Sequence, residues 1–221
     1  MPGYAATLAR VEDYFDRSAT KVWERLTSDA PVSRIRQTVR EGRTSMRALM
    51  LAQLPADLHG LRVLDAGCGA GQMTAELAAR GARVMAVDIS PALVAIARAR
   101  LPAAHAPLVT FASGDMTADH GAFDYVLAMD SLIYYDTTDI TLALARLGAR
   151  TARKVIFTVA PRTPFLMTFW TLGRAFPRAD RSPVMVPHAH ATLSRATGGK
   201  VTKVDRISRG FYISECLEYR P

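Results

Sequence analysis

Four aspartates stand at or just beyond the ends of four successive apolar runs: Asp65, Asp88, Asp115 and Asp130. Carboxylates accept hydrogen bonds from hydroxyl and amino groups and pair with cations. If the apolar runs are neighbouring parallel strands, their carboxyl ends meet at one edge of a sheet, where ligands of α/β proteins bind. The sequence therefore predicts a row of acids that holds a ligand with sugar hydroxyls and a positive centre.

The first of these aspartates opens a glycine-rich turn, Asp65-Ala-Gly-Cys-Gly-Ala-Gly71. Glycine lets a backbone approach a ligand closely, and the N-terminus of the helix expected after the turn offers unpaired N–H groups. The dinucleotide pattern G-x-G-x-x-G would need glycine or alanine at position 72, where this chain has Gln72. An acid just before the turn suits a ligand with an α-amino group better than it suits a pyrophosphate.

The elements that position these residues alternate between strand and helix, which predicts an α/β fold. Ser90 and Pro91 mark a helix start, with a capping hydroxyl followed by proline at the first helical position. The closing strands can pair as a hairpin, so we expect a doubly wound, mostly parallel, seven-stranded sheet. The expected strands span residues 61–65, 83–88, 108–112, 125–129, 154–160, 200–206 and 211–219.

The glycine turn, the acid 21 residues after Gly67 and the acid after the third strand together resemble the Rossmann-like S-adenosylmethionine-dependent methyltransferases. The resemblance implies that S-adenosyl-L-methionine is the cofactor and S-adenosyl-L-homocysteine the product. It places Asp88 on the ribose hydroxyls, Asp115 on the adenine amine, Met116 on the ring and Arg34 near the methionine carboxylate. The cofactor positions that it implies are Arg34, Asp65, Gly67, Cys68, Gly69, Asp88, Ile89, Asp115, Met116, Met129 and Asp130.

The segment before the glycine turn reads as a helical arm or lid, residues 1–58, ahead of a methyltransferase core, residues 59–221. Short helices are expected near residues 4–17 and 18–26, followed by one long helix over 32–54. One face of the long helix carries five arginines, for which we expect mainly a solvated face, with some neutralising an anionic substrate or a membrane surface. These are Arg34, Arg36, Arg40, Arg43 and Arg47.

A substrate-covering insertion is expected over residues 161–190, which hold the densest aromatic stretch of the chain. Phe165, Phe169, Trp170 and Arg174 are the expected substrate-binding residues there, although such a stretch also fits ordinary core packing. The His188-Ala-His190 pair has no nearby cysteine or acid, so no metal site is predicted. Contact of either histidine with a ligand's metal stays open.

Several further stretches look like the magnesium-protoporphyrin IX O-methyltransferases of bacteriochlorophyll and chlorophyll synthesis: residues 12–17, 23–26, 32–36, 130–135 and 208–214. The resemblance implies methyl transfer to a propionate carboxylate of the porphyrin, with magnesium chelatase handing over the substrate. It places Tyr14 on a mobile arm above the site. Tyr134 stands where some relatives have histidine, and we expect its hydroxyl to orient the carboxylate.

Three other functions stay open. A methyltransferase of quinone precursors would have to deprotonate a phenol near Asp130. A nicotinamide-dependent oxidoreductase is disfavoured by Gln72. A non-catalytic porphyrin or cofactor carrier would keep the fold without the chemistry.

Composition bounds the setting of the protein. The net charge is +8, and of the 28 basic residues only four are lysines. Arginine favours carboxylate, phosphate or anionic-lipid partners, and we expect no nucleic acid. We expect no signal peptide, because the first ten residues contain no continuous apolar stretch, and no apolar run of the sequence is long enough to span a bilayer. The two cysteines, Cys68 and Cys216, suggest no disulfide framework. The expected location is the cytoplasm, with peripheral contact at the inner membrane.

Overall fold

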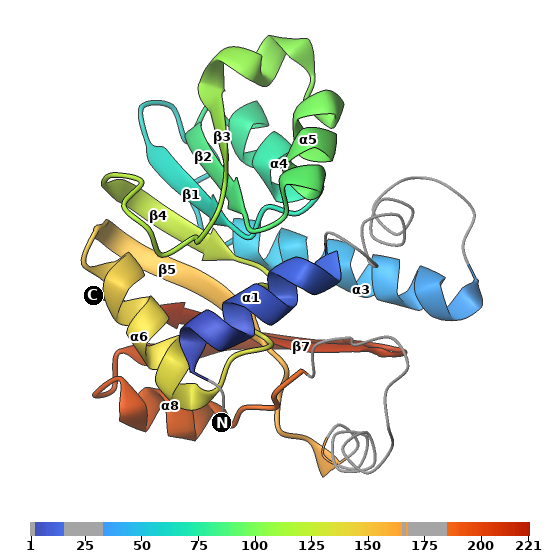
Figure 1. Ribbon diagram of the computed structural model, residues 1–221, viewed down its shortest axis with the longest axis vertical. Coiled ribbons are helices and arrows are strands. Elements are labelled where there is room, and N and C mark those ends of the chain that lie inside the picture. Colours follow the sequence, from blue (N-terminus) through green and yellow to red (C-terminus); the bar gives the residue numbers. More distant parts are fainter. Residues whose placement is uncertain (1–2, 16–32, 165–166, 168–184) are drawn as a thin grey trace.

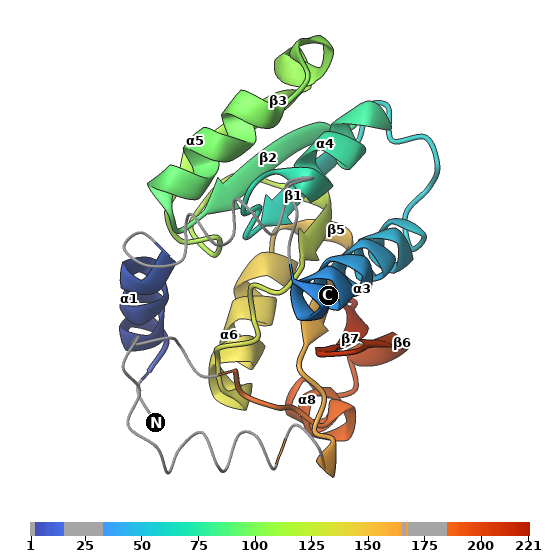
Figure 2. The same ribbon diagram turned by 90° about the vertical axis from the view of Figure 1, so that its right-hand side faces the viewer.

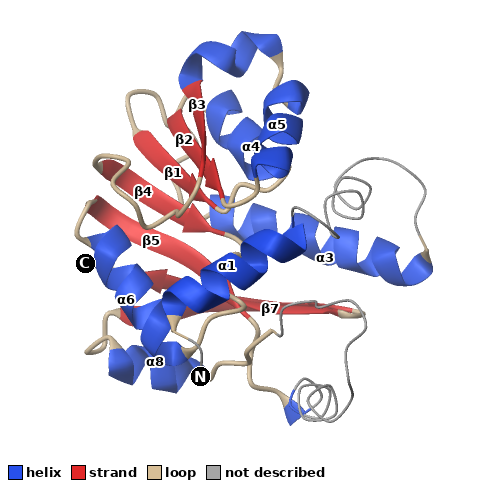
Figure 3. Cartoon of the chain, viewed as in Figure 1, coloured by secondary structure: helices blue, strands red, loops and turns tan. Residues whose placement is uncertain are grey.

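A computed structural model describes residues 3–15, 33–164, 167 and 185–221 of the chain. Strands form a central layer with helices on both sides (Figure 3). The helices are α1 (Tyr4–Tyr14), α3 (Arg34–Leu51), α4 (Gln72–Ala79), α5 (Pro91–Arg100), the 3₁₀ helix η2 (Ala103–Leu108), α6 (Thr137–Gly148) and α8 (His190–Ala196). The strands are β1 (Arg62–Ala66), β2 (Arg83–Asp88), β3 (Val109–Ser113), β4 (Phe123–Ala128), β5 (Thr151–Val159), β6 (Val201–Arg209) and β7 (Tyr212–Tyr219).

The sheet has seven strands in the order β3-β2-β1-β4-β5-β7-β6. The five strands from β3 to β5 pair in parallel, whereas β7 runs antiparallel to both β5 and β6. The predicted doubly wound, mostly parallel sheet of seven strands and its closing hairpin are therefore confirmed. Strand order reverses around β1, so the carboxyl ends of β1, β2 and β4 meet at the edge where α/β proteins bind their ligands.

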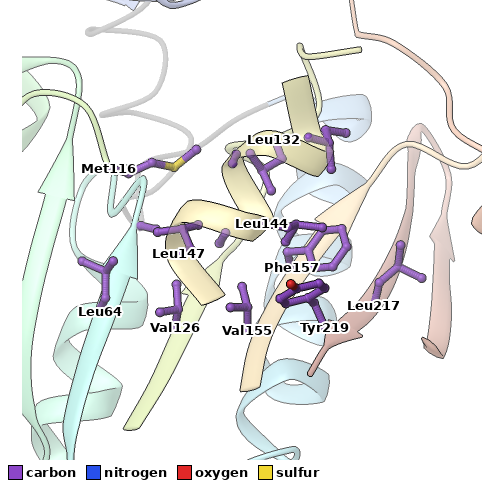
Figure 4. Packing of buried hydrophobic residues seen from close by; sticks show 14 of the residues in the cluster. Leu64, Met116, Val126, Leu132, Leu144, Leu147, Val155, Phe157, Leu217 and Tyr219 are labelled. Atoms are coloured by element: carbon purple, nitrogen blue, oxygen red, sulfur yellow. The ribbon is translucent and has the colours of Figure 1, made fainter. Parts of the chain in front are cut away.

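Alternate residues of the central strands enter different cores, as the period of two in a strand requires. In β1, Val63 packs with the cluster under α3 and α4, while Leu64 packs with the cluster under α6. Figure 4 shows Leu144 and Leu147 of α6 beside the strand side chains in that second cluster. With both faces covered, the central strands are held rigidly, and the loops at their carboxyl ends start from fixed positions.

Capping side chains fix where the helices next to that edge begin. The hydroxyl of Ser90 accepts a hydrogen bond from the backbone N–H of Leu93, with Pro91 at the first helical position, as predicted. Ser33 caps α3 by accepting from the backbone N–H of Arg36. The helix expected over 32–54 exists but is shorter at both ends.

Helices α1 and α3 flank the carboxyl edge of the sheet. In Figure 1 the ribbon of α1 passes the end of β4, and the quarter turn of Figure 2 places α1 and α3 on different sides of the sheet edge. The helix expected near residues 18–26 lies outside the described residues. Within the part of the chain that is described, no helix combines the length and apolar character needed to cross a membrane.

Candidate functional site

A cavity enclosing about 990 Å³ of empty space, part of it continuous with solvent, lies at the carboxyl edge of the sheet. Its walls come from α1, α3, the glycine turn and the segments that follow β2, β3 and β4. Three of the four predicted aspartates line it: Asp65, Asp88 and Asp130. Residues far apart in the sequence thus converge on the edge that strand order marks as the ligand site.

The glycine turn is tied to the neighbouring strand by its own backbone. The N–H groups of Gly67 and Cys68 donate to the carbonyl oxygen of Val87 at 2.8 and 3.0 Å. Gly67 has φ +85°, and a Cβ there would come within 2.5 Å of Ser131. At Gly69, with φ +53°, a Cβ would meet nothing within 4 Å. Gly69 therefore presents bare backbone to the cavity, which is the close approach that a cofactor requires.

Asp88 is the last residue of β2 and holds the turn in place. Its Oδ2 accepts the N–H of Gly69 at 2.8 Å, and its Oδ1 accepts the N–H of Ser90 at 3.0 Å. The carboxylate is 8% exposed and lines the cavity. Each carboxylate oxygen has two lone pairs and can accept more than one hydrogen bond, which suits this residue to ligand hydroxyls.

Asp65 is almost completely buried, with 1% of its surface exposed. Burial raises the pKa of its carboxyl to about 7, the negative charge of Asp88 adds to the increase, and the hydrogen bond from the Thr74 hydroxyl opposes it. A cationic group placed in the cavity would stabilise the ionised form of Asp65. The carboxyl is therefore suited to a ligand that carries an amino group.

Asp115, the fourth predicted acid, follows β3 and does not belong to the cavity lining, although its neighbour Met116 does. Its Oδ1 accepts the hydroxyl of Tyr4 from α1 at 2.6 Å, as well as the backbone N–H and hydroxyl of Thr117. The ring of Tyr4 stacks on Tyr135 with centroids 5.0 Å apart. These contacts hold α1 across the site.

Asp130 lies at the centre of a polar network that the sequence did not predict. It is the only non-glycine residue with positive φ, 57°, among the described residues. Its backbone N–H donates to the Thr158 hydroxyl at 2.8 Å, and its carboxylate accepts from Thr158 and from the hydroxyl of Tyr212 at 3.2 and 3.1 Å. Arg43 of α3 forms an ion pair with Asp130. Strain of this kind is characteristic of functional positions.

The two predicted tyrosines differ in position. Tyr134 lines the cavity, and burial raises the pKa of its hydroxyl well above the usual range, with the charge of Asp130 adding to the effect. Tyr14 is not among the lining residues. Its neighbour Phe15 lines the cavity and packs against both rings, at 5.3 Å from Tyr14 and 6.3 Å from Tyr134.

Arg34, the arginine predicted to face the cofactor, does not line the cavity, and two other arginines of α3 do. Arg34 is exposed at the first residue of α3 and is absent from the lining, whereas Arg43 and Arg47 line the cavity. Gly42 and Met46 are buried and mark the inner face of α3, and the two lining arginines directly follow them. This burial results from tertiary packing, which the sequence pattern alone does not show. The other predicted cofactor positions, Cys68, Ile89 and Met129, also line the cavity.

Four predicted substrate-binding residues, Phe165, Phe169, Trp170 and Arg174, lie outside the described residues. His188 is buried, and its ring nitrogens lie 2.9 Å from the Tyr135 carbonyl oxygen and 3.4 Å from the Thr137 hydroxyl. It therefore serves as an internal hydrogen-bonding group.

Two family models match the chain: one described as "Magnesium-protoporphyrin IX methyltransferase C-terminus" over residues 128–221, and one described as "Methyltransferase domain" over residues 63–153. A magnesium-protoporphyrin O-methyltransferase of Rhodobacter capsulatus is 60% identical over 220 residues, covering 99% of this chain and 98% of that protein.

Solved structures give the same picture of the fold. A crystal structure of the Synechocystis magnesium protoporphyrin IX methyltransferase with bound SAH superposes with a TM-score of 0.79 at 29% identity, covering 96% of this chain and 99% of that one. A second structure of the Synechocystis protein, with bound SAM, gives a TM-score of 0.76 at 27% identity, with 97% of each chain covered.

Proposed function

The chain belongs to the magnesium-protoporphyrin O-methyltransferase family, and we propose that it transfers a methyl group from S-adenosyl-L-methionine to a propionate carboxylate of magnesium-protoporphyrin IX. The product is the monomethyl ester, and its formation is a step of bacteriochlorophyll and chlorophyll biosynthesis. The observation that carries the substrate is the 60% identity along nearly the whole of both chains. Similarity limited to the glycine turn would have indicated the cofactor alone.

The residues around the cavity fit the cofactor. Bare backbone at Gly69 accommodates a closely approaching nucleoside, Asp88 is suited to ribose hydroxyls, and Asp65 suits the amino group of the methionine portion. When bound, the cofactor supplies a methyl group on a positively charged sulfur. Met116 and Met129 give the cavity an apolar wall on which a purine ring can pack.

The chemistry makes modest demands on the protein. A propionic acid has a pKa near the reference value of about 4, so it is ionised at neutral pH and requires no general base. Its oxygen forms the new bond to the methyl carbon while the carbon–sulfur bond breaks, and the electron pair stays on sulfur as a neutral thioether. The protein must align these three atoms and exclude water, which weakens a carboxylate nucleophile.

Residues in the cavity wall can both exclude water and align the reacting atoms. Leu8, Val11 and Phe15 bring the apolar side of α1 into the cavity wall, where they displace water. The hydroxyl of Tyr134 has a raised pKa, so it remains protonated and can donate to a carboxylate oxygen. Tyr14 contributes by packing on Phe15, which keeps α1 closed.

The proposal includes the setting of the enzyme. We place it in the cytoplasm, in peripheral contact with the membrane, and receiving its poorly soluble substrate from magnesium chelatase. Support comes from the net charge of +8, most of it arginine, which anionic lipid and porphyrin propionates both attract.

Competition between acceptors tests the proposed function. Purified enzyme with methyl-labelled cofactor is given magnesium-protoporphyrin IX and a phenolic quinone precursor together, and the label in each is counted. We expect the porphyrin to take nearly all of it. Preferential labelling of the phenol would assign the chain to quinone methylation, and cofactor binding without labelling of either acceptor would indicate a carrier.

Conservative variants test the roles of the two tyrosines. Tyr134→Phe should lower kcat roughly tenfold with cofactor affinity unchanged, because it removes one hydrogen bond to the carboxylate. Tyr14→Phe keeps the ring and should change turnover less. Wild-type turnover in Tyr134→Phe would exclude the orienting role.

A further inference from the structure

Arg43 is a charged group in the cavity wall whose position several elements determine together. It comes from α3, and its guanidinium Nη1 donates to Oδ2 of Asp130. The side chains of the pair are 17% and 9% exposed, so water screens their charges only weakly. Asp130 is in turn bonded by Thr158 of β5 and Tyr212 of β7.

Further contacts around Asp130 and Arg43 fix the position of this ion pair. Asp130 adopts a backbone conformation with φ +57°, which costs energy for a non-glycine residue, and the Thr158 hydroxyl stabilises it by accepting from its backbone N–H. Gly42 is buried against Tyr212, where a Cβ would lie only 2.6 Å from the ring, so α3 lies close to β7 at this point. The result is a guanidinium fixed in direction at the cavity.

The charges around the cavity restrict how a carboxylate can enter. Among the described lining residues the acids are Asp65, Asp88 and Asp130, and the basic residues are Arg43 and Arg47. Arg47 pairs with Glu76 of α4, the helix that follows the glycine turn, so it lies on the cofactor side. Arg43 lies beside Asp130, the acid whose charge also acts on the Tyr134 hydroxyl.

We propose that Arg43, positioned by Asp130, Thr158 and Tyr212, binds the propionate carboxylate that is methylated and thereby makes the enzyme select the free acid over its ester. A guanidinium carries N–H donors on several edges of a planar group, and this shape lets it bridge two carboxylates. It holds one oxygen of the propionate while the other faces the methyl group. This inference rests on the proposed function and specifies how its substrate is recognised.

Ligands that differ only at the reacting group test the inference. With S-adenosyl-L-homocysteine bound, so that no turnover occurs, the affinities for magnesium-protoporphyrin IX and for its monomethyl ester are measured by fluorescence titration. The wild type should prefer the free acid by roughly ten- to a hundredfold, as expected for a hydrogen bond between charged groups.

The informative variant is Arg43→Met combined with Asp130→Asn. It removes both charges of the ion pair together, and asparagine tolerates a positive φ, so folding should be kept. Its preference for the acid should fall at least about tenfold, while S-adenosyl-L-homocysteine affinity stays within about threefold of the wild type. The single variant Arg43→Lys, which keeps a positive charge at this position, should retain part of the preference for the acid. Arg36→Met, an exposed change on the same helix, is the matched control and should behave as wild type.

Each alternative result overturns the inference. An unchanged preference in the double variant would mean that another group recognises the propionate. A loss of S-adenosyl-L-homocysteine affinity of tenfold or more would assign Arg43 to the cofactor carboxylate. A wild type that methylates the porphyrin but binds acid and ester equally would also contradict it, whereas a wild type that does not methylate the porphyrin refutes the proposed function itself.

Discussion

Removing the hydroxyl of Tyr4 should speed the release of the cofactor. That hydroxyl donates to Asp115 at 2.6 Å and so joins α1 to the segment after β3. Leu8 and Val11 of α1, and Phe15 just after it, also line the cavity, so we expect movement of α1 to open this side of the site. Tyr4→Phe weakens the closed position and leaves the apolar contacts in place.

The structure sets the expected size of the effect. Phenylalanine keeps the stack on Tyr135 and the contact with Arg146, whose guanidinium carbon lies 5.9 Å from the ring centroid. Asp115 still accepts from Thr117, so no carboxylate is left unsatisfied and the penalty is the net bond, about 1–2 kcal/mol. The opening equilibrium of α1 should therefore increase about 5- to 30-fold.

The rate of S-adenosyl-L-homocysteine dissociation, measured by stopped flow, should rise by that factor, and amide exchange in residues 4–14 should rise in parallel. Tyr219→Phe deletes the same atom on β7, remote from the cavity lining, and should change neither. Unchanged release in Tyr4→Phe, despite faster exchange in α1, would refute the role of α1 as a cover. Slower release would mean that Tyr4 competes with the cofactor for Asp115.

Three further changes have distinct expected outcomes. Gly67→Ala should lower the free energy of unfolding by several kcal/mol, because its Cβ would lie 2.5 Å from Ser131. Gly69→Ala should lower it by only about 1 kcal/mol and yet weaken cofactor binding more than tenfold. Chemical denaturation measures the stability of each variant, and calorimetric titration measures its cofactor affinity. The folded-state pKa of Asp65, about 7, lies above its unfolded value near 4, so the contribution of Asp65 to apoprotein stability declines as pH rises from about 4 to about 7. Cofactor affinity should increase over the same pH interval, because ionised Asp65 attracts the amino group. In Asp65→Asn both pH dependences should disappear, and their persistence would assign them to another group. His188→Ala should lower the free energy of unfolding by about 1–3 kcal/mol, because buried hydrogen bonds are lost. The absorption spectrum of the bound magnesium porphyrin should stay the same. An altered spectrum would indicate contact of His188 with the metal.

Much of the fold was predictable because local signals were strong. Alternating strand and helix patterns, with Ser90 and Pro91 marking the start of α5, identified the elements of the core. Strand ends were placed within a few residues, and β2 over Arg83–Asp88 matched its predicted bounds. Boundaries elsewhere shifted because hydrogen bonding with neighbouring strands, which no local pattern encodes, determines where a strand begins.

The site was predictable where it follows from a strand end and not where it depends on packing. Asp65 and Asp88 were found because each follows an apolar run, and both line the cavity. Arg43 was one of five arginines on a helix, and only the packing of Gly42 against Tyr212 determines which of them faces inward. The bond between Tyr4 and Asp115 joins positions 111 residues apart, a contact that no spacing rule could indicate.

Transfer of an isotopic methyl label to the porphyrin most directly tests the claim that a carboxylate is the acceptor. Wild-type enzyme is incubated with methyl-labelled S-adenosyl-L-methionine and magnesium-protoporphyrin IX, and the recovered porphyrin is then treated with mild alkali. The account predicts at most one label per porphyrin, released as methanol because the label sits in an ester. Label that resists alkali, or its absence from a porphyrin exposed to cofactor-saturated enzyme, would contradict it.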